Sequence, residues 1–147
     1  MKRIAALMGV ILLIGLFGAS CEARADSDTF SFSARLSFGY DVVSGTPFSI
    51  TVTTENTSGA DYLYRGSSTV VGAIIELSAE VDGRKVTYQP TAVPITNDYR
   101  ETLIKNGERI VYTWHFGEYE PLIPATYDLH IAFEGEKEVV EDFLTVQ

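Results

Sequence analysis

The chain has 147 residues, with 20 acidic against 11 basic side chains and a formal net charge of −9 at pH 7. Such an acidic surface argues against nucleic acid as a partner, because it would repel the phosphates. The single cysteine excludes an intrachain disulfide and a thiolate metal site, and the length suits one domain behind a targeting segment.

The N-terminus has the pattern of an export signal. The basic start Met1-Lys2-Arg3 is followed by Ile4 to Phe17, a stretch without any charge. This stretch is shorter than the roughly 20 residues of a transmembrane helix, and it is typical of the apolar part of a bacterial secretory signal. We therefore expect residues 1–25 to form a signal peptide with a helical apolar part, and residues 26–147 to form a single domain.

Two processing sites compete at the end of this segment. Gly18-Ala19-Ser20-Cys21 is similar to a lipobox, in which Cys21 would be lipidated and become the new N-terminus. Ala23-Arg24-Ala25 matches the A-x-A site of ordinary signal peptidase, with cleavage before Asp26. The first site predicts a membrane-anchored lipoprotein of the cell envelope, and the second predicts a secreted or periplasmic protein.

The first mature segments alternate between apolar and polar residues, which is the period-two pattern of strands with one buried face. Thr29–Phe38 and Pro47–Thr54 are predicted strands, and their inward residues are Phe30, Phe32, Ala34, Leu36, Phe38, Phe48, Ile50 and Val52. A turn at Asn56–Gly59 leads to a short strand at Asp61–Arg65, which is rich in tyrosine.

The middle of the chain predicts a hairpin and then a loop. Ala73–Val81 alternates, and Asp82-Gly83 is typical of a tight turn because both residues tolerate positive φ. The chain is expected to return through Val86 and Tyr88. Gln89–Tyr99 holds two prolines and no periodicity, so we expect an extended loop there.

The last third predicts the centre of the core. After a short strand at Arg100–Ile104 and a turn at Asn106-Gly107, two long strands flank the loop Gly117–Pro124. Their expected inward residues are Ile110, Tyr112, Trp114, Phe116, Tyr127, Leu129, Ile131 and Phe133. A turn at Gly135 precedes the strand Glu138–Val146. We expect Glu138 and Asp142 to point outward, where charge discourages edge-to-edge pairing.

These segments give short strands at close spacing, and no helix-period segment follows the signal. The predicted fold is therefore all-β, an antiparallel immunoglobulin-like (Ig-like) β-sandwich of about seven to nine strands with Trp114 between the layers.

Several motifs also resemble a known family. Leu103-x-x-Asn106-Gly107-Glu108, then Trp114, then Ile123-Pro124-Ala125-Thr126-Tyr127-Asp128-Leu129 resembles the end of the bacterial intracellular proteinase inhibitor domain (BsuPI type). Ile50-Thr51-Val52 followed by Asn56-Thr57-Ser58 is similar to an earlier strand and turn of that domain. The resemblance runs from about Pro47 to the end of the chain, and it implies an Ig-like sandwich and proteinase inhibition.

Catalytic and metal chemistry have little support in the sequence. His115 and His130 are the only histidines, and pairing of the two long strands would place His115 opposite Asp128 and His130 opposite Thr113. No nucleophile elbow surrounds the nearby threonines, and two histidines without a third ligand make a poor zinc site. We therefore expect a protein that is not an enzyme and uses no metal or cofactor.

Binding is the function class that remains, and three hypotheses follow. The first is a module that binds another protein through loops or an exposed sheet face. The second is a proteinase inhibitor that inserts Gln89–Tyr99 or Gly117–Pro124. The third is a carbohydrate-binding module. The tyrosines outside the long strands are candidate contact residues for a protein partner or for a sugar, namely Tyr62, Tyr64, Tyr99 and Tyr119.

Overall fold

The computed structural model describes residues 23–26, 29–37, 41–67, 71–92 and 98–147. The predicted signal helix, the lipidation site Cys21 and the predicted inward residue Phe38 lie outside the described residues.

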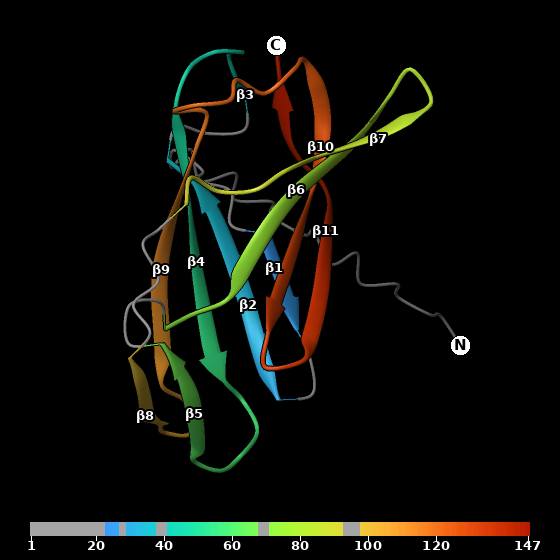
Figure 1. Ribbon diagram of the computed structural model, residues 1–147. Helices are drawn as coiled ribbons and strands as arrows, with labels where there is room; N and C mark the ends of the chain where they lie inside the picture. The colour runs from blue at the N-terminus through green and yellow to red at the C-terminus, as the bar shows by residue number, and fades with distance from the viewer. Residues whose placement is uncertain (1–22, 27–28, 38–40, 68–70, 93–97) are drawn as a thin grey trace, which may run out of the picture.

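Two sheets form the layers of a sandwich (Figure 1). The four-stranded sheet has the order β1-β2-β4-β9, and all its neighbours are antiparallel. Its strands are β1 (Ala23–Asp26), β2 (Phe30–Leu36), β4 (Phe48–Asn56) and β9 (Arg109–Phe116). The five-stranded sheet has the order β3-β11-β10-β6-β7. Its strands are β3 (Asp41–Val42), β11 (Glu136–Val146), β10 (Ala125–Phe133), β6 (Ile74–Val81) and β7 (Arg84–Tyr88).

A separate two-stranded sheet lies at one end of the sandwich. It pairs β5 (Tyr62–Ser67) with β8 (Tyr99–Ile104), while β3 and the connection between β9 and β10 lie at the opposite end (Figure 1). The predicted all-β Ig-like sandwich is confirmed. The described residues contain eleven strands, more than the predicted seven to nine, because β3 is only two residues long and β1 falls where the sequence indicates a signal peptide.

Two features are typical of Ig-like domains. Strand β2 pairs with β4 in the four-stranded sheet. The chain then crosses to the other layer, where β3 pairs in parallel with β11. At the start of β10 the hydroxyl of Tyr127 donates a hydrogen bond to the carbonyl oxygen of Ile123, at 2.8 Å. This tyrosine corner fixes the chain where it enters the second layer.

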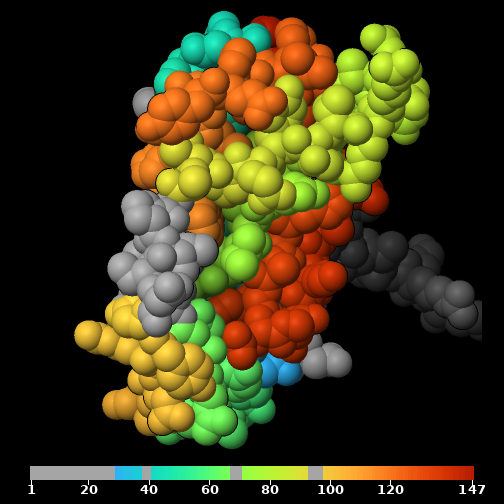
Figure 2. Space-filling model, viewed as in Figure 1, coloured from blue at the N-terminus to red at the C-terminus, as the bar shows by residue number. Residues whose placement is uncertain are grey.

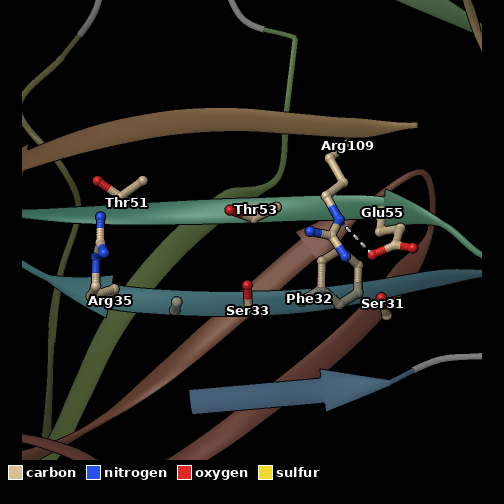
Figure 3. A pocket seen from close by; sticks show the side chains of 9 residues that line it. Ser31, Phe32, Ser33, Arg35, Thr51, Thr53, Glu55 and Arg109 are labelled. Atoms are coloured by element: carbon tan, nitrogen blue, oxygen red, sulfur yellow. Dashed lines mark hydrogen bonds and ion pairs between the residues drawn. The ribbon is translucent and has the colours of Figure 1, made fainter. Parts of the chain in front are cut away.

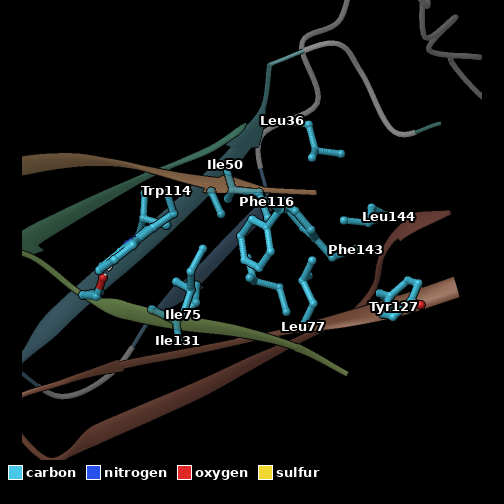
Figure 4. Close-up of a cluster of buried hydrophobic side chains, with 14 of the residues drawn as sticks. Leu36, Ile50, Ile75, Leu77, Trp114, Phe116, Tyr127, Ile131, Phe143 and Leu144 are labelled. Carbon is cyan, nitrogen blue, oxygen red and sulfur yellow. Dashed lines mark hydrogen bonds between the residues drawn. The ribbon is translucent and has the colours of Figure 1, made fainter. Parts of the chain in front are cut away.

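The core lies between the two layers, as the alternation predicts (Figure 4). Every second residue of β2, β4 and β10 is buried, and so are Trp114 and Phe116 of β9. Figure 4 shows Ile50 and Trp114 of one sheet facing Ile75 and Ile131 of the other. Burying these side chains stabilises the fold by roughly 1.5–3 kcal/mol for each large apolar residue.

The predicted pairing of the two long strands is wrong. β9 pairs with β4 in one sheet, whereas β10 pairs with β6 and β11 in the other. His115 therefore does not lie opposite Asp128, and instead its Nδ1 is 2.8 Å from the hydroxyl of Ser49. His130 lies 2.7 Å from the hydroxyl of Ser78 rather than beside Thr113. Two strands joined by a short loop can belong to different layers, because the connections of a sandwich can run from one sheet to the other.

Glu138 also differs from its predicted outward position. It pairs with the buried Ile131, so the two residues share the inward face, and Glu138 is half-buried there. Asp142 is exposed as predicted, within a bulge where its φ is 50° and its backbone N–H donates to Asp128 Oδ1. The Asp82-Gly83 turn is confirmed, because both residues have positive φ.

Asn56, predicted in a turn, is the last residue of β4 and is buried. Its side-chain N–H groups donate to the carbonyl oxygens of Ala60 and Ile104, at 2.8 and 3.0 Å. Its Oδ1 accepts from the backbone N–H and the hydroxyl of Ser58. This side chain ties the end of the four-stranded sheet to the β5–β8 pair.

We expect Asn56→Ala to lower the free energy of unfolding by about 1–3 kcal/mol, because it removes the buried hydrogen bond to the carbonyl oxygen of Ile104. Urea denaturation followed by far-ultraviolet circular dichroism measures the loss. Thr57→Ala, at an exposed neighbouring position, is the control and should change stability by less than about 0.5 kcal/mol. Equal losses for the two variants would refute the role assigned to Asn56.

Candidate functional site

The outer face of the four-stranded sheet is covered with hydroxyl groups. Antiparallel pairing places Ser33, Thr53 and Val111 in one row across β2, β4 and β9, and Arg35, Thr51 and Thr113 in the next. The side chains that β2, β4 and β9 turn to this face are Ser31, Ser33, Arg35, Ser49, Thr51, Thr53, Glu55, Arg109, Val111, Thr113 and His115. We call this set the hydroxyl face.

A hollow of about 290 Å³ lies in the hydroxyl face (Figure 3). Arg35 and Arg109 stand at its two ends, with Ser33 and Thr53 between them. The pairing rows of the two arginines are four residues apart, which corresponds to about 13 Å along a strand. The remaining lining comes from Ser31, Phe32, Ala34, Thr51 and Glu55.

The polar groups of the hollow differ in how they are paired. Arg109 Nε lies 2.9 Å from Glu55 Oε2, and the hydroxyls of Thr51 and Thr113 are 3.0 Å apart. Within the described part of the chain, the side chains of Arg35, Ser33 and Thr53 have no hydrogen bond or ion pair. Arg35 therefore offers a free guanidinium, and the two hydroxyls offer free donors and acceptors, to a ligand in the hollow.

The histidines make two serine–histidine contacts that the sequence did not indicate. His115 with Ser49 spans β9 and β4, and His130 with Ser78 spans β10 and β6. Neither histidine hydrogen-bonds a carboxylate among the described residues, so neither pair has the third group that orients a catalytic histidine. Both contacts are of the cross-strand type that stabilises sheets.

The four candidate tyrosines do not come together. Tyr62 and Tyr64 lie on β5 and pack against the core, Tyr62 on Phe30 and Tyr64 on Phe133. Tyr99 is 66% exposed at the start of β8, and Tyr119 is 86% exposed in the connection between β9 and β10. These two segments lie at opposite ends of the sandwich (Figure 1), so the four residues form no common patch.

Tyr62 has a structural partner of its own. Its hydroxyl donates to Glu134 Oε2 at 2.6 Å. This hydrogen bond to a carboxylate, together with partial burial, raises the pKa of Tyr62 to about 12. The contact ties β5 to the hairpin between β10 and β11.

The two loops proposed for inhibition also differ from expectation. Part of Gln89–Tyr99, residues 93–97, lies outside the described residues. In the second loop Leu122 is buried and its carbonyl oxygen accepts a hydrogen bond from Ser44, while Ile123 accepts from Tyr127. The exposed residues of that loop are Glu118–Pro121 before the buried Leu122, and Ile123 and Pro124 after it, so the loop offers only two short exposed stretches.

No group of three or more acidic, histidine or cysteine residues is arranged to hold a metal ion in the described ranges. Within the same ranges, no helix has the length and apolar character needed to cross a membrane.

Comparison with known proteins gives a fold and no family. No family model matches the sequence, and neither does any curated protein. A β-glucosidase from Erythrobacter marinus superposes with a TM-score of 0.51 at 10% identity, over 81% of this chain and 15% of the enzyme. The likeness is one of fold. The chain thus spans less than a sixth of that enzyme.

Two further structures are more distant. A β-glucosidase from Listeria innocua in complex with gluconolactone has a TM-score of 0.43 at 15% identity, over 78% of this chain and 16% of the enzyme. The alkylpurine DNA glycosylase AlkC of Pseudomonas fluorescens, bound to DNA with an abasic site analog, has a TM-score of 0.44 at 9% identity, over 84% of this chain and 31% of that chain. The resemblance to BsuPI-type inhibitors stays a prediction.

Proposed function

We propose that the chain is a non-catalytic binding module of the cell envelope, and that it holds its ligand on the hydroxyl face. The observation that carries this proposal is the free guanidinium of Arg35 beside the free hydroxyls of Ser33 and Thr53 in one hollow. Unpaired polar groups on a rigid sheet are ready to bind a ligand without first breaking internal hydrogen bonds.

The N-terminal sequence supports location in the envelope and favours an anchored form. β1 pairs with β2 along Ala23–Asp26. Cleavage before Asp26 would remove three of the four residues of this strand, whereas processing ahead of Cys21 keeps all of them. A lipid on Cys21 would then attach the sandwich to a membrane through a short N-terminal segment.

The hydroxyl face has more support than the loops or the tyrosines. Protein binding through exposed aromatic residues requires a patch, and Tyr99 and Tyr119 lie at opposite ends of the domain. Proteinase inhibition, which the family resemblance implies, requires a long exposed segment, and the buried Leu122 interrupts the exposed part of this loop after Glu118–Pro121.

Thr53, on β4 and in the lining of the hollow, offers a direct test. Thr53→Phe fills the hollow with an aromatic side chain that a strand tolerates well, and we expect it to weaken ligand binding at least tenfold. The measurement is the change of backbone amide resonances when a solubilised envelope fraction is added. In the wild-type protein, the resonances that shift should be those of residues 31–35 and 51–55.

Thr87→Phe is the matched control, since Thr87 is exposed on β7 in the other sheet. It should bind as the wild type does. Shifts confined to Glu118–Pro121, or unchanged binding by Thr53→Phe, would refute the hydroxyl face as the binding surface.

A further inference from the structure

We infer that the hollow of the hydroxyl face binds an acidic polysaccharide, with one of its anionic groups held by Arg35. This inference rests on the proposed function and names the ligand class of the same surface. It depends on three properties of the face: its charge, the geometry of its donors, and its lack of apolar anchors.

The charge of the hydroxyl face is opposite to that of the whole chain. The full sequence has a net charge of −9. Among the residues of β2, β4 and β9 that make up the hydroxyl face, the one acidic side chain is Glu55, which is paired with Arg109, and Arg35 has no acidic partner among the described residues. The chain as a whole repels an anionic polymer, and the hydroxyl face, with two arginines against one glutamate, is a place where such a polymer can approach.

The donors of the hollow suit an anion that is attached to a polyol. A guanidinium binds a carboxylate or a phosphate through two parallel N–H···O bonds. Arg35 pairs in register with Thr51, and Ser33 pairs with Thr53, so a free guanidinium and free hydroxyls stand in neighbouring rows. Hydroxyl groups both donate and accept hydrogen bonds, and they therefore complement the hydroxyls of sugar rings.

An acidic peptide fits the face less well than a polysaccharide. Protein interfaces obtain most of their affinity from apolar and aromatic anchors in the centre of the contact. Val111 is the one large apolar side chain exposed on the hydroxyl face, and it lies on β9 outside the lining of the hollow. The face carries no exposed aromatic ring that would stack on a neutral sugar, so recognition has to depend on charge and hydroxyl groups.

The experiment measures the affinity of the mature chain for defined polymers at low and moderate salt. Polygalacturonate supplies carboxylates, and a phosphorylated mannan supplies phosphates. We expect binding to at least one of these, and the tighter one identifies the anion. Neutral counterparts that keep the hydroxyls, carboxyl-reduced polygalacturonate and unphosphorylated mannan, should bind at least tenfold more weakly than the better acidic polysaccharide. Polyglutamate should also bind at least tenfold more weakly than that polysaccharide.

The variants separate a specific contact from overall charge. Arg35→Gln should weaken binding about tenfold, and Arg35→Lys should recover part of that loss because the charge is kept without the fork. Arg84→Gln is the matched control. Arg84 lies on the β6–β7 hairpin, which projects from the body of the domain (Figure 2), and its loss should change affinity less than twofold. Unchanged circular dichroism spectra and urea midpoints confirm that the variants fold.

Several results would overturn the inference. The inference fails if a neutral counterpart or polyglutamate binds as tightly as the better acidic polysaccharide. It also fails if Arg35→Gln and Arg84→Gln lose affinity equally. If none of the acidic polymers shifts residues 31–35 while an envelope fraction still does, the ligand class is wrong and the proposed function stands. If neither the polymers nor the envelope fraction shift them, both proposals fail.

Discussion

Trp114→Ala is expected to lower the free energy of unfolding by about 3–5 kcal/mol, the range for a large aromatic residue removed from a core. Trp114 is only 8% exposed. Its indole N–H donates to the carbonyl oxygen of Ala73 at 2.9 Å. The centroid of its ring lies 4.6 Å from the ring centroid of Tyr112. Ala73 immediately precedes β6, so this one side chain links the four-stranded sheet to the five-stranded sheet.

Two variants separate the contributions of Trp114. Trp114→Phe keeps an aromatic ring in the core but removes the N–H, so it should lose less than Trp114→Ala while leaving the Ala73 carbonyl without its donor. Val111→Ala, at a 60% exposed position on the same strand, should stay within about 0.5 kcal/mol of the wild type. Urea curves must be followed by far-ultraviolet circular dichroism, because Trp114 is the only tryptophan. A loss for Trp114→Ala no greater than that for Val111→Ala would contradict its place in the core.

Alternation predicted the strands well because burial of one face is a local property of the sequence. Phe30, Phe32, Ala34 and Leu36 were expected inward, and all are buried. The tight turn at Asp82-Gly83 was equally readable, since its positive φ angles demand these residue types. Both signals act over a few residues, and neither requires knowledge of the neighbouring strand.

Strand partners could not be predicted in the same way. The alternation of β9 and β10 is equally compatible with one sheet or with two facing sheets, because both arrangements bury the same residues. The actual partner of β9 is β4, more than fifty positions earlier in the chain. The assumed pairing therefore placed His115 beside Asp128, whereas it contacts Ser49.

The candidate site was missed for the same reason. Outward serines and threonines on a single strand indicate only a solvated surface. Ser33 and Thr53 become neighbours, with Arg35 and Arg109 at either end, only when the order β2-β4-β9 is known. The tyrosines attracted attention because of their residue type, but Tyr62 and Tyr64 are occupied by contacts with the core.

Tyr127 should make the protein sensitive to alkaline pH. Its side chain is fully buried and hydrogen-bonded to Ile123, and burial, with a smaller contribution from the hydroxyl of Tyr88, raises its pKa from 10.0 to about 12. The folded state holds this proton more tightly than the unfolded chain does. The contribution to stability is therefore complete below pH 10 and is lost as the pH rises toward 12. At about 1.4 kcal/mol per pH unit, the loss is on the order of 2–3 kcal/mol.

Tyr127→Phe tests this expectation at two pH values. Near pH 7 it should cost about 1–2 kcal/mol, because the carbonyl oxygen of Ile123 loses its donor. Between pH 10 and pH 12 its stability should fall less steeply than that of the wild type, although Tyr62, whose pKa is also raised to about 12, keeps part of the slope in both proteins. Tyr119→Phe, at an 86% exposed position, should reproduce the wild-type curve at both pH values. If Tyr127→Phe and the wild type lose stability in parallel above pH 10, ionisation of Tyr127 is not coupled to folding, and the tyrosine corner would act through its hydrogen bond alone.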